Sequence, residues 1–388
     1  MFPGFDEQLR RYADVIVQVG LNLRRGQRIL ISDPYTLHGV SRAAATLVDA
    51  VAAAARTAGA AGVEVLWGDE AVWRHAAHDW PHAPFIATIE QNARRITESI
   101  ARGDALVFLE TANPGLGAGL PAAGVAGLRH HGTLAYASFA PALLSGATNW
   151  TAAPAPTPPW ADTVFADLPA ADRPAALWSA VFAACRCHDA DPIAAWRIHL
   201  SALEQHRDHL DRQRLVAVRL RGPGTDLRLA LHPAHRWCTA VLATRDARPF
   251  VPNLPTDEIF TAPHPGSASG RLRVARPITH GGTTIAGIEL RFRDGLVVEA
   301  RAQTGREVLA RLLATDPGAL RLGEVALVPQ PTAIAHTGRV FHNALLDENA
   351  LPHLALGDAY EFTAPGHPVN HSLLHLDLPV EAELELIP

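Results

Sequence analysis

The feature that most constrains the fold is an alternation of apolar strands and helices in the N-terminal part of the chain. Three short apolar runs typical of buried strands occur at residues 28–32, 63–67 and 105–109. Stretches with helical spacing or many alanines lie before and between them, at residues 5–19, 40–59 and 86–102. Because parallel strands need long crossovers, this order predicts an α/β layer with a mostly parallel sheet.

Beyond residue 215 the sequence changes character. Apolar and polar side chains alternate at residues 215–220, 227–231 and 288–292, which is typical of half-buried strands. Helices are predicted over residues 170–184, 192–214 and 306–313. A chain of 388 residues is too long for one core. We therefore expect an N-terminal α/β domain, residues 1–195, and a C-terminal α+β catalytic and metal-binding domain, residues 196–388.

Composition excludes several classes of function. All 34 basic residues are arginine, so the chain has no lysine for a Schiff base or a phosphate-binding loop. The net charge of -5 does not favour a nucleic-acid partner. Three cysteines do not suggest a disulfide framework, and no apolar run is long enough to span a membrane. We expect a cytoplasmic protein with no membrane partner.

Histidines and carboxylates lie within apolar stretches of the second half. Residues two apart in a strand share a face, so His375 and Asp377 are predicted to point together. Leu374, Leu376 and Leu378 would then point into the core. A histidine and a carboxylate placed in this way can bind one metal ion between them.

Glu324 has a similar setting, with Val325 and Leu327 predicted to face the core. An unpaired buried carboxylate is costly, so a counter-charge is expected, and a metal ion would supply it. Single residues of this kind are nevertheless more often hydrogen-bonded core residues, and Asp347 and Glu348 are typical of a turn. Spacing alone identifies neither the metal nor the reaction.

Other motifs have structural interpretations. Asn149 and Trp150 are expected to organise a loop, and the glycine-rich residues 115–119 are expected to form one. Cys185 and Cys187 resemble half a zinc site, but no second pair accompanies them.

Longer motifs, in order along the chain, resemble those of the aminopeptidase T / AmpS / PepS family of metallopeptidases. The resemblance covers nearly the whole sequence. It is carried by residues 19–23 (VGLNL), 148–151 (TNWT), 191–196 (DPIAAW), 222–227 (GPGTDL), 253–256 (NLPT), 323–328 (GEVALV), 347–350 (DENA) and 375–377 (HLD).

The resemblance implies a metal-dependent aminopeptidase that acts on peptide or aminoacyl substrates and forms a homodimer. It implies two divalent ions, zinc or cobalt, with manganese or magnesium as further alternatives. The metal ligands would be Glu258, Glu324, His353, His375 and Asp377. Tyr360 would lie beside the metals and, with Glu258 and Glu324, would take part in catalysis.

The chain departs from the family pattern at several positions. Asp257 stands where a glutamate is expected, and His342 and Asn343 replace apolar and acidic residues. Leu378 replaces a tryptophan, and the sequence stops at Pro388, earlier than expected. These differences leave open a specialised biosynthetic amide hydrolase.

Two further alternatives belong to other classes. His353, His375 and Asp377 would also suit a mononuclear iron(II) ring-cleaving dioxygenase of the related dihydroxypyridine type. Glu258 and Glu324 argue against it, because a single-iron site needs neither. A non-catalytic scaffold predicts lost ligands, whereas all five are present.

Overall fold

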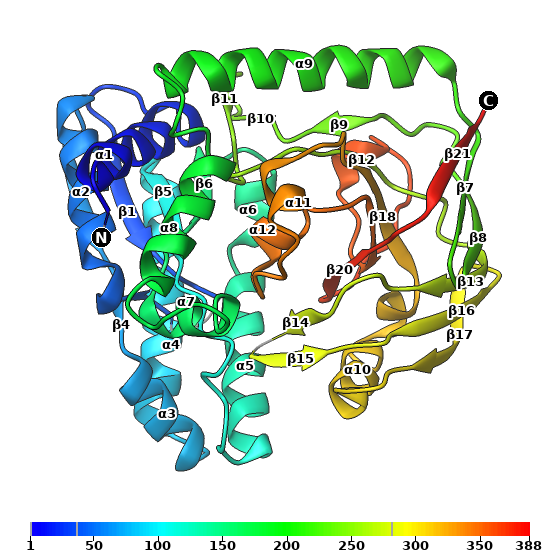
Figure 1. The fold of residues 1–388 in the computed structure, drawn as a ribbon, viewed down its shortest axis with the longest axis horizontal. Helices are drawn as coiled ribbons and strands as arrows, with labels where there is room; N and C mark the ends of the chain where they lie inside the picture. The colour runs from blue at the N-terminus through cyan, green and yellow to red at the C-terminus, as the bar shows by residue number, and fades with distance from the viewer. Residues whose placement is uncertain (1, 36–37, 281) are drawn as a thin grey trace. The chain divides into compact units, whose positions relative to one another are not determined.

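The structure is a computed structural model that describes residues 2–35, 38–280 and 282–388. The chain forms two compact units (Figure 1). Unit 1 combines Met1–Ile198 with a returning segment, Val241–Thr256, and unit 2 combines His199–Ala240 with Asp257–Pro388. Unit 1 contains a parallel sheet with helices and unit 2 contains antiparallel sheets, which confirms the predicted mixed α/β class.

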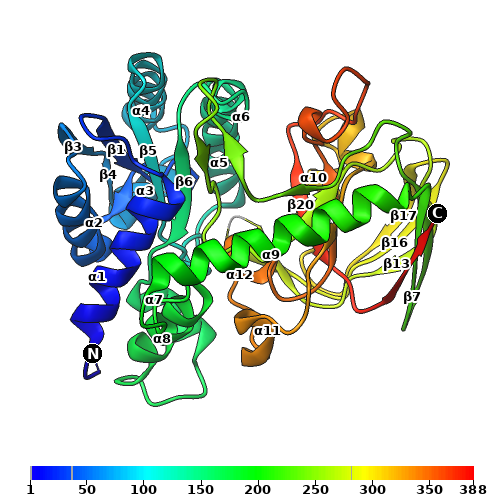
Figure 2. The same ribbon diagram turned by 90° about the horizontal axis from the view of Figure 1, so that it is seen from above.

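The sheet of unit 1 has four parallel strands in the order β3-β1-β5-β6. The strands are β1 (Arg28–Ser32), β3 (Gly62–Val65), β5 (Ala105–Glu110) and β6 (Trp150–Pro154). They lie side by side among the helices of this unit (Figure 2). β5 and β6 are buried along nearly their whole length, as expected of parallel strands covered on both faces. The three strands predicted in this region are confirmed, and β6 is not among them.

The helices of this unit follow or precede the strands along the chain. They are α1 (Phe5–Val15) with a π-helical turn (Ile16–Gly20), a 3-10 turn (Arg42–Ala44), α2 (Ala45–Thr57), α3 (Glu70–His78), α4 (Ala83–Arg102), α5 (Ala122–Ala137), α6 (Ala140–Leu144), α7 (Pro158–Val164) and α8 (Arg173–Ala184). A short parallel pair is formed by β2 (Val40–Ser41) and β4 (Trp67–Gly68). The boundary between the units falls within α9 (Pro192–Gln213).

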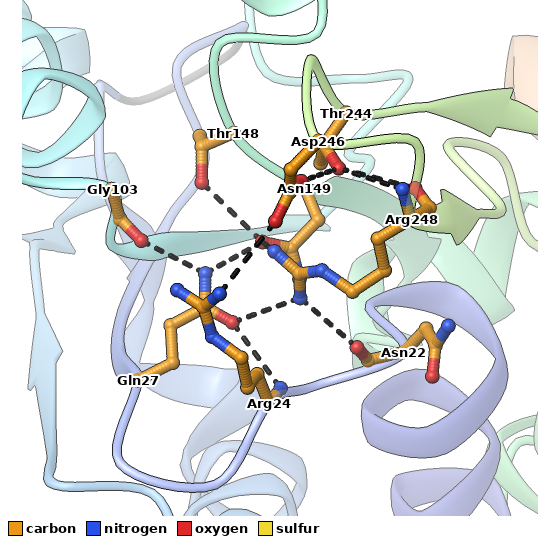
Figure 3. A network of polar contacts seen from close by, with 9 residues as sticks. All are labelled: Asn22, Arg24, Gln27, Gly103, Thr148, Asn149, Thr244, Asp246 and Arg248. Atoms are coloured by element: carbon orange, nitrogen blue, oxygen red, sulfur yellow. Dashed lines mark hydrogen bonds and ion pairs between the residues drawn. The ribbon is translucent and has the colours of Figure 1, made fainter.

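A polar network holds the returning segment within unit 1 (Figure 3). Arg248 donates hydrogen bonds to the Asn22 carbonyl, Gln27 Oε1 and Asn149 Oδ1, at 3.1, 3.2 and 3.1 Å. The fully buried Asn149 also accepts from Gln27 Nε2 and donates to the Leu21 carbonyl, at 2.7 and 2.6 Å. The predicted role of Asn149 in organising a loop is confirmed.

Unit 2 is built on two antiparallel sheets. The six-stranded sheet, in the order β17-β16-β13-β8-β7-β21, consists of β7 (Ala217–Gly222), β8 (Thr225–Ala230), β13 (Ser269–Arg273), β16 (Glu289–Arg293), β17 (Leu296–Arg301) and β21 (Glu383–Ile387). The five-stranded sheet, in the order β20-β19-β18-β12-β9, consists of β9 (Cys238–Thr239), β12 (Ile259–Thr261), β18 (Leu322–Leu327), β19 (His353–Gly357) and β20 (His375–Pro379).

The two sheets of unit 2 share one apolar core. Leu220 and Leu227 of the six-stranded sheet belong to the same buried cluster as Val325, Leu354 and Leu376 of the five-stranded sheet. Side chains alternate between the faces of a strand, so the residues between these apolar ones face away from the core. The predicted metal ligands of β18, β19 and β20 lie on that second face.

The remaining elements are short. They are the hairpins β10 (Leu242–Ala243) with β11 (Pro249–Phe250) and β14 (Ile278–His280) with β15 (Thr283–Ile285), the helices α10 (Arg306–Leu313), α11 (Ala333–Thr337) and α12 (Ala344–Asp347), and the 3-10 turns Pro317–Leu320 and Glu361–Thr363. α10 confirms the helix predicted there. In the part of the chain that the structure describes, no helix has both the length and the apolar character needed to cross a membrane.

Replacing Asn149 by alanine is expected to destabilise the protein. The Leu21 carbonyl, the Gln27 amide and the Arg248 guanidinium would each lose a buried partner. Because an unpaired buried polar group costs about 1–3 kcal/mol, we expect the free energy of unfolding to fall by about 2–4 kcal/mol in urea denaturation. Gln91→Ala, on the exposed side of α4, is the control and should change it by less than about 0.5 kcal/mol. Equal stability of both variants would contradict this role of the network.

His38 is expected to make the protein sensitive to acid. Its imidazole is buried close to Gly132, and burial lowers its pKa to about 4. The imidazole is therefore protonated at a higher pH in the unfolded chain than in the folded protein. The stability contributed by neutral His38 is present above the ordinary pKa of 6.5 and is lost as pH falls toward 4. His38→Leu should remove up to about 3 kcal/mol of the pH dependence of unfolding in this window. If wild type and His38→Leu show the same pH dependence of unfolding, His38 is not the source of the acid sensitivity.

Candidate metal centre

The five-stranded sheet of unit 2 brings the five predicted ligands onto one face. Glu324 lies in β18, His353 begins β19, and His375 and Asp377 lie in β20. Glu258 directly precedes β12, which pairs with β18. The register places Ala355 opposite both Glu324 and Asp377, so a small side chain separates the two carboxylates along that row.

Glu258, Glu324 and His353 form the first group, in which one ligand atom from each residue lies within 4.8 Å of the others. All three side chains are buried. His353 Nε2 lies 3.3 Å from Glu258 Oε2 and 3.3 Å from Glu324 Oε1. The imidazole and the two carboxylates therefore converge on one point.

Glu324 also belongs to a second group, with His375 and Asp377. His375 Nε2 lies 3.3 Å from Asp377 Oδ1, and the other ring nitrogen, Nδ1, is 2.9 Å from the Asp358 carbonyl. A hydrogen bond from Nδ1–H to that carbonyl leaves the Nε2 lone pair directed at the group. The structure thus contains two candidate ion sites with one carboxylate in common.

The spacing of these atoms fits a metal ion. Two ligands bound tetrahedrally at about 2.0 Å from zinc lie about 3.3 Å apart. Glu258 Oε2 is buried and, among the residues described here, makes no hydrogen bond, although His353 Nε2 lies 3.3 Å away. A buried carboxylate oxygen without a hydrogen bond is costly unless a cation contacts it. The donor set of carboxylate oxygens and imidazole nitrogens suits zinc, cobalt or manganese.

The site also attracts protons when no cation is considered. Burial, followed by the charge of Glu324, raises the pKa of Glu258. Burial alone would lower the pKa of the two imidazoles, but the neighbouring carboxylates outweigh it. The pKa of His353 is held well above its usual value by Glu258 and Glu324, and that of His375 is raised to about 10 by Asp377. The raised pKa values show that this cluster of buried carboxylates favours the binding of positive charge.

Glu348 is a site residue that the sequence analysis assigned to a turn. It caps the C-terminal end of α12 and is buried, and its Oε1 has no hydrogen-bond partner within the described part of the chain. Burial, followed by the charges of Glu258 and Asp377, raises its pKa well above the usual value. Glu348 lies among the apolar residues Leu345, Leu346 and Ala350. These apolar neighbours are a signal of burial, but a helix of four residues shows no period that would predict which way the carboxylate points.

Tyr360 lies beside the second group. Its ring centroid is 5.5 Å from that of His375. Phe362 stacks on Tyr360 at 5.2 Å with an angle of 12° between the rings, and Phe260 contacts both rings. These contacts restrict the orientation of the tyrosine ring.

The positions that depart from the family pattern have structural partners. Asp257 lies 3.2 Å from His199, and His342 Nδ1 lies 2.7 Å from Thr279 Oγ1. Leu378 belongs to the core of unit 2. Cys185 and Cys187 are both buried thiols that are not part of a disulfide.

Comparison with known proteins finds similar proteins over nearly the whole length of the chain. The family model described as thermophilic metalloprotease (M29) matches residues 5–387. Aminopeptidase T of Thermus thermophilus is 37% identical over 389 residues, 98% of this chain and 94% of that protein. Aminopeptidase AmpS of Bacillus subtilis is 30% identical over 96% of this chain and 92% of its own length. The solved structure of wild-type AmpT from Thermus thermophilus has a TM-score of 0.90 at 36% identity and covers 99% of this chain and 96% of that one.

Replacing Glu324 by glutamine should affect both candidate ion sites, because both use this carboxylate. We expect the wild-type protein to bind two divalent ions and Glu324→Gln to lose at least tenfold in affinity for both, measured by elemental analysis after dialysis. Asp377→Asn should weaken only the second group. Glu299→Gln, at an exposed ion pair of β17, is the matched control and should retain both ions. Full metal content in Glu324→Gln would exclude a shared ligand.

Proposed function

This chain belongs to the thermophilic metalloprotease family M29, and we propose that it is an aminopeptidase that cleaves the first peptide bond of its substrates with two divalent ions. The proposal places both ions on the five-stranded sheet of unit 2. Glu258 and His353 would hold one ion, His375 and Asp377 the other, and Glu324 both.

The membership of Glu324 in both groups is the observation that carries the proposal. A bridging carboxylate is suited to two ions that lie about 3.5–4 Å apart. The balance of charge in the site also supports two ions. Glu258, Glu324, Glu348 and Asp377 are four carboxylates linked by mutual electrostatic effects, and two divalent ions would supply four positive charges.

Ions bound there would supply Lewis-acid activation of a water molecule and of the scissile carbonyl. Glu348 is a buried carboxylate that belongs to neither ligand group, so it would accept the proton of the attacking water and pass it to the leaving amine. Tyr360, held by its aromatic neighbours, would donate a hydrogen bond to the developing oxyanion. The free amine of the substrate would bind one of the ions, which would restrict cleavage to the first residue.

The grouping of ligands favours this proposal over a single-iron dioxygenase. That alternative uses His353, His375 and Asp377 as one triad and leaves Glu258 and Glu324 without a role. In the structure His353 instead groups with the two glutamates. A specialised amide hydrolase would use the same two-ion centre and would differ only in its substrate.

Removing the metal should abolish hydrolysis. We expect dialysis against a chelator to eliminate turnover of a panel of aminoacyl anilides, and zinc or cobalt to restore it. N-terminally acetylated versions should not be cleaved, because they lack the free amine. Iron-dependent oxygen uptake together with no anilide cleavage would contradict the proposal.

Glu348→Gln separates proton transfer from metal binding. We expect kcat to fall by about 10²–10⁴-fold, because a positioned acid–base group contributes that much, while both ions remain bound. Glu361→Gln is the local control, since its side chain is 83% exposed. Turnover within twofold of wild type in Glu348→Gln would exclude Glu348 as the proton carrier.

A further inference from the structure

The side chain of Asn349 connects two parts of the metal centre that lie 92 residues apart in the sequence. Its Oδ1 accepts a hydrogen bond from the backbone N–H of Asp257 at 2.6 Å, and its Nδ2 donates to the Leu345 carbonyl at 2.7 Å. The residue is fully buried. One amide therefore joins the loop before β12 to α12.

Asn349 is also fixed through its backbone. Thr332 Oγ1 donates to its carbonyl oxygen at 2.6 Å, and its own N–H donates to the Leu346 carbonyl at 3.1 Å. Thr332 in turn accepts from the N–H of Ala335 at the start of α11. Hydrogen bonds to both its carbonyl oxygen and its N–H thus fix the backbone from which the Asn349 amide projects.

The two residues next to these contacts are the carboxylates of the site. Glu258 follows Asp257, whose N–H is held, and Glu348 precedes Asn349. Both side chains are buried, and each has a carboxylate oxygen without a hydrogen-bond partner among the described residues. Neither lies within a strand, so no sheet register fixes the distance between them. Like charges repel, and without a tether the two loops would separate.

A neutral amide suits this tether. Its oxygen accepts one backbone hydrogen bond and its nitrogen donates another, so the loops are joined without a further negative charge. Aspartate would keep an oxygen for the Asp257 N–H, but it would lose the donor to Leu345 and would add a fifth carboxylate.

We infer that Asn349 is a positioning residue of the metal centre, whose amide sets the separation of Glu258 and Glu348 so that the site is formed before a divalent ion binds. The inference rests on the proposed two-ion function. Groups that orient metal ligands typically change metal affinity 10–100-fold when they are removed. Asn349 should therefore affect ion binding as well as folding.

The test compares Asn349→Ala with Asn149→Ala. Asn149 is also a fully buried asparagine whose amide joins two segments, but it lies in unit 1. Metal-free wild type and both variants are titrated with zinc against a chromophoric chelator, and the visible spectrum of the cobalt-loaded form reports the coordination. Thermal unfolding is measured without metal to compare stability. Thr332→Val, which removes only the bond to the Asn349 carbonyl, is a milder second variant.

We expect Asn349→Ala to bind zinc about 10–100-fold more weakly and to have an altered cobalt spectrum. Asn149→Ala should lose thermal stability but bind zinc within about twofold of wild type, because it touches no ligand. Thr332→Val should lie between wild type and Asn349→Ala.

An Asn349→Ala protein that binds zinc as tightly as Asn149→Ala would overturn the inference and leave the two-ion proposal intact. A wild type that binds neither zinc nor cobalt would instead refute the two-ion proposal itself. If Asn349→Ala does not fold, Thr332→Val decides, and zinc affinity equal to that of wild type would overturn the inference.

Discussion

The structure of unit 2 depends on one electrostatic constraint, which is that several carboxylates are buried close together. Carboxylates in a protein interior need protons, hydrogen bonds or cations to offset the loss of solvation. Two histidines offset part of the charge, and the raised pKa values of Glu258 and Glu348 show that the remainder is not compensated. Divalent ions would complete the compensation.

Two kinds of support hold the ligands. Glu324, His353, His375 and Asp377 lie in β18, β19 and β20 of one sheet. Alternation along these strands turns leucines and valines into the core and the polar residues to the opposite face. Glu258 and Glu348 lie outside strands and depend on side-chain contacts, of which the Asn349 bridge is the most direct. The strand residues are thus placed by the same packing that stabilises the unit, whereas the loop residues need hydrogen bonds of their own.

The sequence predicts the first kind of support well and the second poorly. Period-two alternation around His375 identifies a residue pair that shares a face, and the core position of Leu374, Leu376 and Leu378 confirms it. Glu348 escapes such reasoning because α12 has only four residues, too few to show a period. The Asn349–Asp257 bridge and the return of residues 241–256 to unit 1 are long-range contacts that no local pattern encodes. Only the family resemblance predicts His353 and Glu258 as metal ligands, because neither residue lies in a distinctive local pattern.

The central claim is that Glu324 bridges two ions, and anomalous diffraction from crystals of the cobalt-loaded protein tests it most directly. Data collected on both sides of the cobalt absorption edge distinguish cobalt from every other element in the crystal. The account predicts two peaks about 3.5–4 Å apart, with the Glu324 carboxylate between them. A single peak bound by His353, His375 and Asp377, with Glu324 bound to no metal, would contradict it.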